Sequence, residues 1–173
     1  MTRVAVWLAA VFCAGSICAQ VAQYRSPPED LPRQLAPQPV KFSHRIHSEA
    51  KMLCVDCHKG VMRQAQAGLP TLGDCMLCHS AVASDKPEVQ RLAALAAGGE
   101  KVQWERAYDV PDFVWFSHQQ HLRADLGCES CHGPVKTRDV LAQERSLNMT
   151  ACMNCHQQKG VSRECYLCHE LGQ

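Results

Sequence analysis

Five short segments of the sequence share one arrangement of sulfur and imidazole side chains: two cysteines three positions apart, followed directly by a histidine. Two thiols at this spacing can form thioether bonds with both vinyl groups of one porphyrin, and the adjacent histidine can then bind the iron. The sequence therefore predicts five covalently attached haem c groups. The segments are Cys54–His58, Cys75–His79, Cys128–His132, Cys152–His156 and Cys165–His169.

Two other uses of paired cysteines compete with haem attachment. An exported protein could join its cysteines in disulfide bonds, and two cysteine pairs together could hold a zinc ion. Neither use requires a histidine after the second cysteine, and five pairs do not divide evenly into sites of four thiolates. We therefore expect attachment through Cys54, Cys57, Cys75, Cys78, Cys128, Cys131, Cys152, Cys155, Cys165 and Cys168, with His58, His79, His132, His156 and His169 as proximal iron ligands.

The four histidines outside these frames lie in two copies of one motif. Phe42-Ser-His-x-x-His47 recurs as Phe116-Ser-His-x-x-His121, and six residues separate each copy from the next frame. This repeat predicts a two-haem unit, a second two-haem unit and an appended fifth haem. Histidines three positions apart on a helical turn share one side and can still serve two flanking irons. We expect His44, His47, His118 and His121 to be distal ligands.

Nine histidines cannot fill the ten axial positions of five low-spin irons. A methionine thioether is the usual substitute and raises the reduction potential. Met149 is our first candidate for this position and Met62 our second. For either residue the alternative is a methionine that fills a gap in the core, and an iron with an open position is the third alternative.

Residues 1–19 have the order of a secretory signal. Arg3 precedes an uncharged apolar run from Val4 to Ile17, and Cys18-Ala19 offers a small-residue cleavage site. The alternative is an uncleaved anchor that associates the protein with a membrane through residues 4–19. Either alternative predicts an exported, periplasmic protein, soluble or anchored to the inner membrane.

The composition excludes several classes of protein. Lys and Arg total 18 against 17 Asp and Glu, so the chain lacks the basic excess of a nucleic-acid binder. Aromatic residues are only 6%, and a chain that carries so many haems has little of its own to build a core. We expect the porphyrins to form the core, and their propionates to make the surface acidic toward redox partner proteins.

The segments between the frames predict a mostly helical and irregular fold with few short strands. Residues 20–39 form a proline-rich leader, 40–84 a dihaem unit, 85–115 a helix and an extended connector, and 116–173 a trihaem unit. We expect a helix over 85–97, which Ser84 or Asp85 would cap, with Pro87 in its first turn and Gly98 after it. Residues 101–116 read as extended chain, and 137–145 as a second short helix.

The two FSHxxH motifs before their frames resemble those of the class III multihaem cytochromes c. That resemblance implies that His44 serves the Cys54 haem and His118 the Cys128 haem, and it leaves the irons of His47 and His121 unassigned. A closer resemblance over residues 40–169 is to the pentahaem subunit of alternative complex III and its relatives, through Val110–His118, Cys131–Val135 and Leu147–Cys152. It implies a relay that faces the periplasm, often anchored by its N-terminus. Ser117 departs from the Asn commoner there.

These observations favour an electron carrier over an enzyme. Two histidines on an iron exclude substrates and limit reorganisation on reduction, so closely spaced haems make a relay. Its partners would be other cytochromes or a membrane quinol oxidoreductase. The alternative is a reductase of nitrite or hydroxylamine at the under-ligated haem, but no histidine remains for proton transfer there. A purely structural role for the haems is the third hypothesis.

Overall fold

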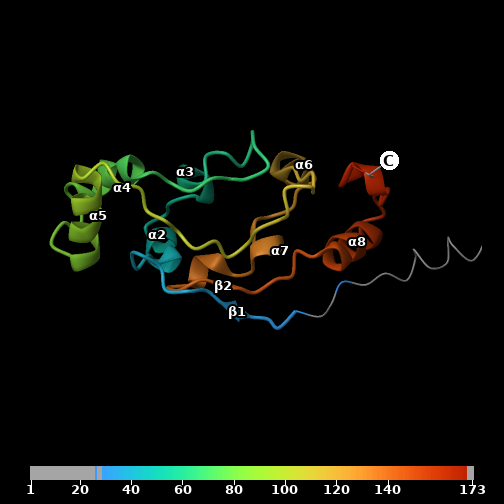
Figure 1. The fold of residues 1–173 in the computed structure, drawn as a ribbon, viewed down its shortest axis with the longest axis horizontal. Helices are drawn as coiled ribbons and strands as arrows, with labels where there is room; N and C mark the ends of the chain where they lie inside the picture. Colours follow the sequence, from blue (N-terminus) through green and yellow to red (C-terminus); the bar gives the residue numbers. More distant parts are fainter. Residues whose placement is uncertain (1–25, 27–28, 171–173) are drawn as a thin grey trace, which may run out of the picture. The chain divides into compact units, whose positions relative to one another are not determined.

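The structure, a computed structural model, describes residue 26 and residues 29–170. Within this part the chain divides into two compact units, one of residues 30–147 and 164–170, the other of residues 148–163 with residues 26 and 29. The larger unit consists of short helices joined by irregular chain, and the described part of the smaller one contains the single helix α8 (Met149–Gln158) (Figure 1). This confirms the expected mixture of helix and irregular chain with few strands.

The larger unit contains most of the secondary structure. Its helices are α2 (His44–Glu49), α3 (Cys54–Cys57), α4 (Leu72–His79), α5 (Pro87–Ala97), α6 (His118–Arg123) and α7 (Glu129–His132), with 3-10 turns η1 (Val135–Thr137) and η2 (Cys165–Leu167). Strands β1 (Arg33–Gln34) and β2 (Ala142–Gln143) pair antiparallel, Arg33 opposite Gln143. The proline-rich leader therefore contributes β1, which lies against the segment that follows the third frame.

Helix α5 lies where the sequence predicts it, with a different start. Pro87 is its first residue and Gly98 ends it, as expected, but the N-cap is Lys86, whose side chain makes no capping bond. The expected cap by Ser84 or Asp85 is therefore wrong. Pro87 lacks a backbone N–H and has a φ suited to a first turn, so it sets the helix start without a polar cap.

The expected helix over residues 137–145 is wrong. A 3-10 turn ends at Thr137, and Ala142–Gln143 is strand β2. Arg138 forms a two-point ion pair with Glu144, whose backbone N–H donates to the hydroxyl of Tyr108 at 3.0 Å. These contacts and the pairing with β1 hold the segment extended. A helix over the same residues would break them. Residues 101–116 are extended or irregular, as expected.

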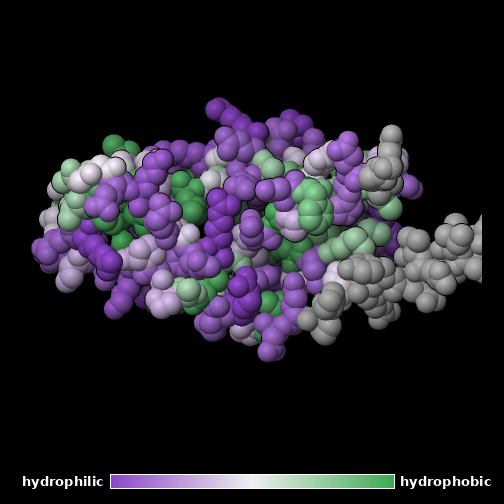
Figure 2. Space-filling view, viewed as in Figure 1, coloured by the Kyte–Doolittle hydropathy of each residue, from purple (hydrophilic) through white to green (hydrophobic). Residues whose placement is uncertain are grey.

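The buried core of the described residues is small and sits beside α5. Val40, Val89 and Leu92 are its buried apolar side chains, and α5 packs against α4. Many large apolar side chains stay exposed, including Leu77, Phe113 and Trp115. Figure 2 shows such hydrophobic surface scattered between hydrophilic residues. Exposed apolar surface on this scale marks a chain that packs around something other than its own side chains.

The smaller unit is built on α8 (Met149–Gln158). The Asn148 side chain caps it by accepting from the N–H of Ala151 at 2.9 Å. The backbone N–H of Ser26 donates to the hydroxyl of Thr150, and the backbone N–H of Thr150 donates to the hydroxyl of Ser26. These two hydrogen bonds tie the leader to the first turn of the helix.

No helix among residues 26 and 29–170 is long and apolar enough to cross a bilayer. The signal or anchor expected in residues 1–19 lies outside the described residues.

Candidate haem-attachment sites

All five cysteine frames lie on a turn of helix. The first four coincide with α3, α4, α7 and α8, and the fifth with η2. None of the ten thiols is in a disulfide bond, and all are half-buried or exposed. Thiols one helical turn apart, each pair followed by a histidine, meet the requirement for two thioether bonds and a proximal ligand from one short segment. The donor set fits haem c, and no disulfide bond forms among the described cysteines.

Five histidine rings are oriented through Nδ1, which lies at hydrogen-bond distance from a backbone carbonyl. Because a carbonyl only accepts, Nδ1 must carry the proton, and the lone pair of Nε2 is left for a metal. The pairs are His47 with Ser43 (2.8 Å), His58 with Gly68 (2.7 Å), His79 with Val82 (3.0 Å), His121 with Ser117 (2.8 Å) and His156 with Ser162 (2.8 Å).

The carbonyl that holds His58 depends on a glycine. Gly68 has a φ of +79°, a conformation that side chains disfavour. The loop before it closes with a bond from the N–H of Gly60 to the carbonyl of Ala67 at 2.8 Å. The sequence feature that could have indicated this contact is the glycine ten residues after His58. The spacing of the frame itself does not indicate it.

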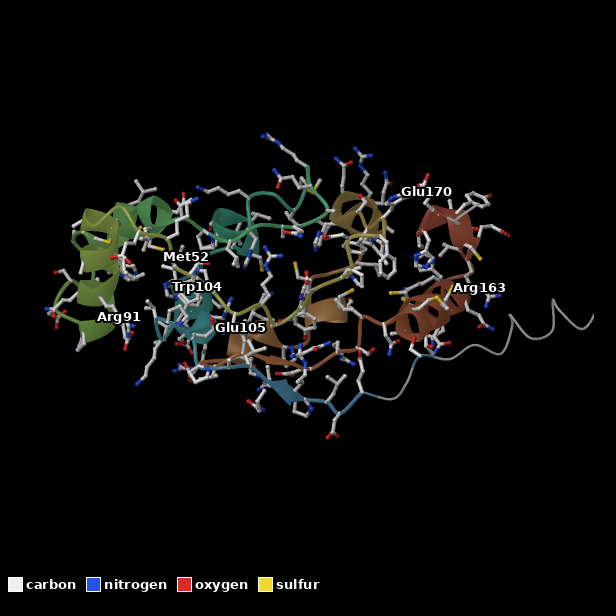
Figure 3. All side chains as sticks on the ribbon, in the orientation of Figure 1. Met52, Arg91, Trp104, Glu105, Arg163 and Glu170 are labelled. Atoms are coloured by element: carbon white, nitrogen blue, oxygen red, sulfur yellow. The ribbon has the colours of Figure 1, made fainter. Side chains whose placement is uncertain are left out.

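Each FSHxxH motif begins a helix with its serine. The hydroxyl of Ser43 accepts from the N–H of Ile46, and Ser117 does the same for Gln120. The phenylalanine packs against both histidines of its motif: Phe42 lies 4.8 Å from His44 and 4.4 Å from His47 between ring centroids. Trp104 adds a further edge contact to Phe42 at 6.3 Å and lies beside α2 in Figure 3.

The second copy repeats this arrangement. The ring of Phe116 lies 4.7 Å from those of both His118 and His121. Sequence reasoning singled out the histidines and missed these roles of phenylalanine and serine. The repeated Phe-Ser pair was the signal that could have found them.

Histidines from different segments come together in pairs. The ring centroids of His47 and His79 are 6.0 Å apart, and those of His118 and His132 are 6.4 Å apart. Two imidazoles bound on opposite sides of one metal, with metal–nitrogen bonds of about 2.0 Å, have centroids about 6 Å apart. The two pairs therefore have the separation of axial ligands of a single iron.

Burial favours the neutral form of the first histidine of each motif. It lowers the pKa of His44 to about 4, with smaller effects from nearby His58 and His47. It also lowers the pKa of His118 and of His132. The neutral ring is the form that binds a metal. Nδ1 of His118 is buried, and among the described residues it has no hydrogen-bond partner.

The first frame lies next to the second and the third. The thiol of Cys54 lies near that of Cys128, and its pKa is raised by burial and then by this neighbour. Burial also raises the pKa of Cys75, and Cys57 is near enough to add to the effect. Lys59 pairs with Asp74 and so connects the chain after the first frame to α4.

The fifth frame is held by the connector before the second motif. Val114 and His169 form an antiparallel bridge, and the N–H of Trp115 donates to the carbonyl of Cys168 at 2.8 Å. The ring of Phe113 lies 6.1 Å from that of His169. The ring that lies at this distance from His169 is thus a phenylalanine, whereas His79 and His132 have a histidine at a similar distance.

The two methionine candidates lie in different units. Met149 is the first residue of α8, in the unit that carries His156. Met62 lies in the loop between α3 and α4, and its carbonyl accepts a bond from the side chain of Gln119 at 3.0 Å. Both side chains are exposed by about two fifths, so neither fills a gap in the protein core.

Tyr108 is a site residue that the sequence did not indicate. Its hydroxyl donates to the carbonyl of His132 at 3.0 Å and accepts from the N–H of Glu144. Its ring meets that of His132 edge-on at 4.7 Å. The residue after this frame is Gly133, where a Cβ would lie 3.2 Å from the Cβ of Glu144. Tyr108 therefore holds His132 both through its backbone carbonyl and through its imidazole ring.

Comparison with known proteins agrees with this chemistry. The family described as "Class III cytochrome C family" matches residues 20–101, and "Cytochrome c7 and related cytochrome c" matches residues 114–170. The menaquinone reductase, multiheme cytochrome c subunit, of Nitratidesulfovibrio vulgaris is 31% identical over 192 residues, which cover 94% of this chain and 90% of the relative. The chain therefore belongs to the multihaem cytochromes c of the class III and cytochrome c7 type, which are electron carriers.

Proposed function

We propose that this chain is a five-haem cytochrome c that relays electrons outside the cytoplasm between a membrane quinone oxidoreductase and other redox proteins. The observation that carries the proposal is the pairing of histidines from separate segments at the separation of axial ligands. A pair of histidines on each iron leaves no position for substrate and suits transfer of electrons alone.

The first three irons would each take one histidine from a frame and one from an FSHxxH motif. His44 would pair with His58, which is near enough to influence its pKa. His47 would pair with His79, and His118 with His132. These assignments agree with the resemblance for His44 and His118 and add an iron for His47.

The fourth and fifth irons follow from the repeat. His121 is the equivalent of His47 and would be the fourth distal histidine, while His156 and His169 would be the proximal ligands of these two irons. One of the ten axial positions then lacks a histidine, and Met149 remains our first candidate for it and Met62 our second. A haem c held by such residues would supply a redox-active iron, and a methionine thioether would favour its ferrous state.

The proximity of thiols from different frames supports a row of haems that does not follow the sequence. Cys54 lies near Cys128, and Cys57 lies near Cys75. The first haem would therefore lie between the second and the third, because thioether bonds fix each porphyrin to its cysteines.

A quinone-linked partner is proposed from the relative. That protein is a subunit of a menaquinone reductase and matches this chain over nearly its whole length. We propose that this chain occupies the same kind of position in a membrane complex, on the exported side, held there by its partner subunits or by residues 4–19.

The test is to count haems and identify their ligands in the purified protein. Intact mass and a pyridine haemochrome assay should give five haems per chain. Ferric EPR with near-infrared magnetic circular dichroism should show four bis-histidine haems and one histidine–methionine haem. A high-spin signal that shifts when nitrite or cyanide is added would contradict the closed relay and support the reductase. Fewer than five haems would contradict the haem count.

A further inference from the structure

The start of α2 is held by the segment that follows the third frame. The hydroxyl of Ser43 donates to Oδ1 of Asp139 at 2.6 Å, and Nε of Arg45 donates to Oδ2 at 3.1 Å. The N–H of Arg45 also donates to the carbonyl of Arg138 at 3.0 Å. Three bonds therefore join α2, which carries His44 and His47, to a segment about ninety positions later in the chain.

The same serine hydroxyl has two roles. It donates to Asp139 and accepts from the N–H of Ile46 at 3.1 Å, so the carboxylate orients the cap that begins the helix. The carbonyl of Ser43 in turn holds Nδ1 of His47 at 2.8 Å. A shift of this serine would therefore move the start of α2 and the ring of His47 together.

The second motif is held differently. Gln119, which is equivalent to Arg45, donates from its side chain to the carbonyl of Met62 at 3.0 Å. The position equivalent to Asp139 is Ala65, which offers no carboxylate. In the described part of the chain, the hydroxyl of Ser117 bonds only within its own helix, to Gln120 at 3.4 Å. Each motif thus meets the segment after the other copy's frame, but only the first meets a carboxylate.

We propose that Asp139 is a positioning residue for the first distal-histidine helix, so that the ligand geometry of the first and second irons depends on a residue of the second copy. This rests on the ligand assignment of the proposed function, and it adds a residue that contacts no haem ligand itself. Its physical basis is that a carboxylate with one hydroxyl and one guanidinium as donors fixes both the register and the direction of α2.

The test is Asp139→Ala in the full-length holo-cytochrome. Haem content, measured by intact mass, should stay at the wild-type value because no attachment residue changes. The low-spin EPR signals of the two haems served by α2 should broaden or convert in part to high-spin signals, and their midpoint potentials should shift. The signals of the other haems should stay. Wild-type signals and potentials throughout would overturn the proposal.

Two further variants separate positioning from a general loss of stability. Asp139→Asn keeps an oxygen to accept from Ser43 but loses the charge that faces Arg45, and its spectrum should lie between those of wild type and Asp139→Ala. Glu49→Ala is the matched control, since it removes the other carboxylate of Arg45, an exposed partner within α2, and should leave the spectrum of the holo-protein unchanged. Equal effects of Glu49→Ala and Asp139→Ala would overturn the proposal.

A double-mutant cycle tests the contact itself. The effects of Asp139→Ala and Ser43→Ala on the low-spin signals should be less than additive, because both variants break the same hydrogen bond. Effects of Asp139→Ala and Ser117→Ala should be additive. Additivity in both cycles would overturn the proposal. Failure of the proposed function would appear in the wild type instead, as a haem count below five or an absence of bis-histidine signals.

Discussion

The two FSHxxH motifs have nearly the same sequence and the same local structure, yet the chain holds them by different means. Both start a helix at a serine cap and place a phenylalanine between two histidines. The first is joined to the opposite copy through the charged contacts of Asp139, and the second through a neutral amide and backbone groups. A duplicated motif therefore does not guarantee equal environments for its histidines, and unequal environments would give the irons proposed for them unequal potentials.

The haem-attachment frames also lie in unequal surroundings. The first frame lies beside two others, whereas the fifth is held by a strand-like bridge to the connector. We expect the double variant Cys54→Ser/Cys57→Ser to have the largest effect of all, because the first haem would pack against the haems of the second and third frames. The variant should accumulate poorly or lose more than one haem, as measured by intact mass and the pyridine haemochrome assay.

Cys165→Ser/Cys168→Ser is the matched control for the loss of a frame. It should lose one haem and keep the others with unchanged low-spin signals. Equal losses from the two double variants would show that the first frame is not central to the row of haems.

Removal of the second histidine of each motif compares the copies directly. His47→Ala and His121→Ala should each convert one low-spin haem to high-spin without changing haem content, since attachment depends on the cysteines. EPR at low temperature measures the conversion. A variant in which no haem becomes high-spin would mean that its histidine is not an axial ligand.

The haem chemistry could be predicted from the sequence because covalent attachment fixes spacing. Two thiols must reach two vinyl groups of one ring, so the frame is local and visible in a single chain. The four candidate distal histidines could be singled out for a related reason, since they repeat as a motif. Which histidines come together is not local: His47 meets His79 and His118 meets His132 only after the chain folds.

The elements were predicted less well where tertiary contacts override local preference. Helix α5 has an apolar face and a proline start, and both are local signals. Residues 137–145 looked helical by the same criteria, but the ion pair of Arg138 with Glu144 and the hydroxyl of Tyr108 fix them as extended chain. Asp139 and Tyr108 could not be predicted as site residues, because each acts on a segment distant in sequence.

Tyr108 offers a smaller and more local test of the difference between copies. His58 is held through its ring by the carbonyl of Gly68, while His132 is held through its own carbonyl by Tyr108. Tyr108→Phe should shift the midpoint potential of one haem and lower the free energy of unfolding by about 1–3 kcal/mol, because the N–H of Glu144 loses its partner. Spectroelectrochemistry and chemical denaturation measure the two effects. An unchanged set of potentials would show that Tyr108 does not influence the iron.

The smallest expected effect is on the pH dependence of stability. The Asp139 carboxyl accepts hydrogen bonds from Ser43 and from Arg45. The first of these most strongly, and then the second, lowers the pKa of the carboxyl from its usual 3.8. A carboxyl whose pKa is lower in the folded state stabilises the protein above the unfolded pKa, and that stability is lost as the pH falls through the folded value. Wild type should therefore be more stable than Asp139→Asn at neutral pH, and the difference should shrink below about pH 4.

Chemical denaturation of both holo-proteins from about pH 7 to about pH 3 measures this difference. The carboxylate is exposed, so the effect should be small and should weaken in high salt. Protonation of the haem ligands affects both proteins alike and cancels in the comparison. Two stability curves that stay parallel down to the lowest pH would mean that the charge of Asp139 adds nothing to the contact, and that its hydrogen bond from Ser43 alone distinguishes α2 from α6.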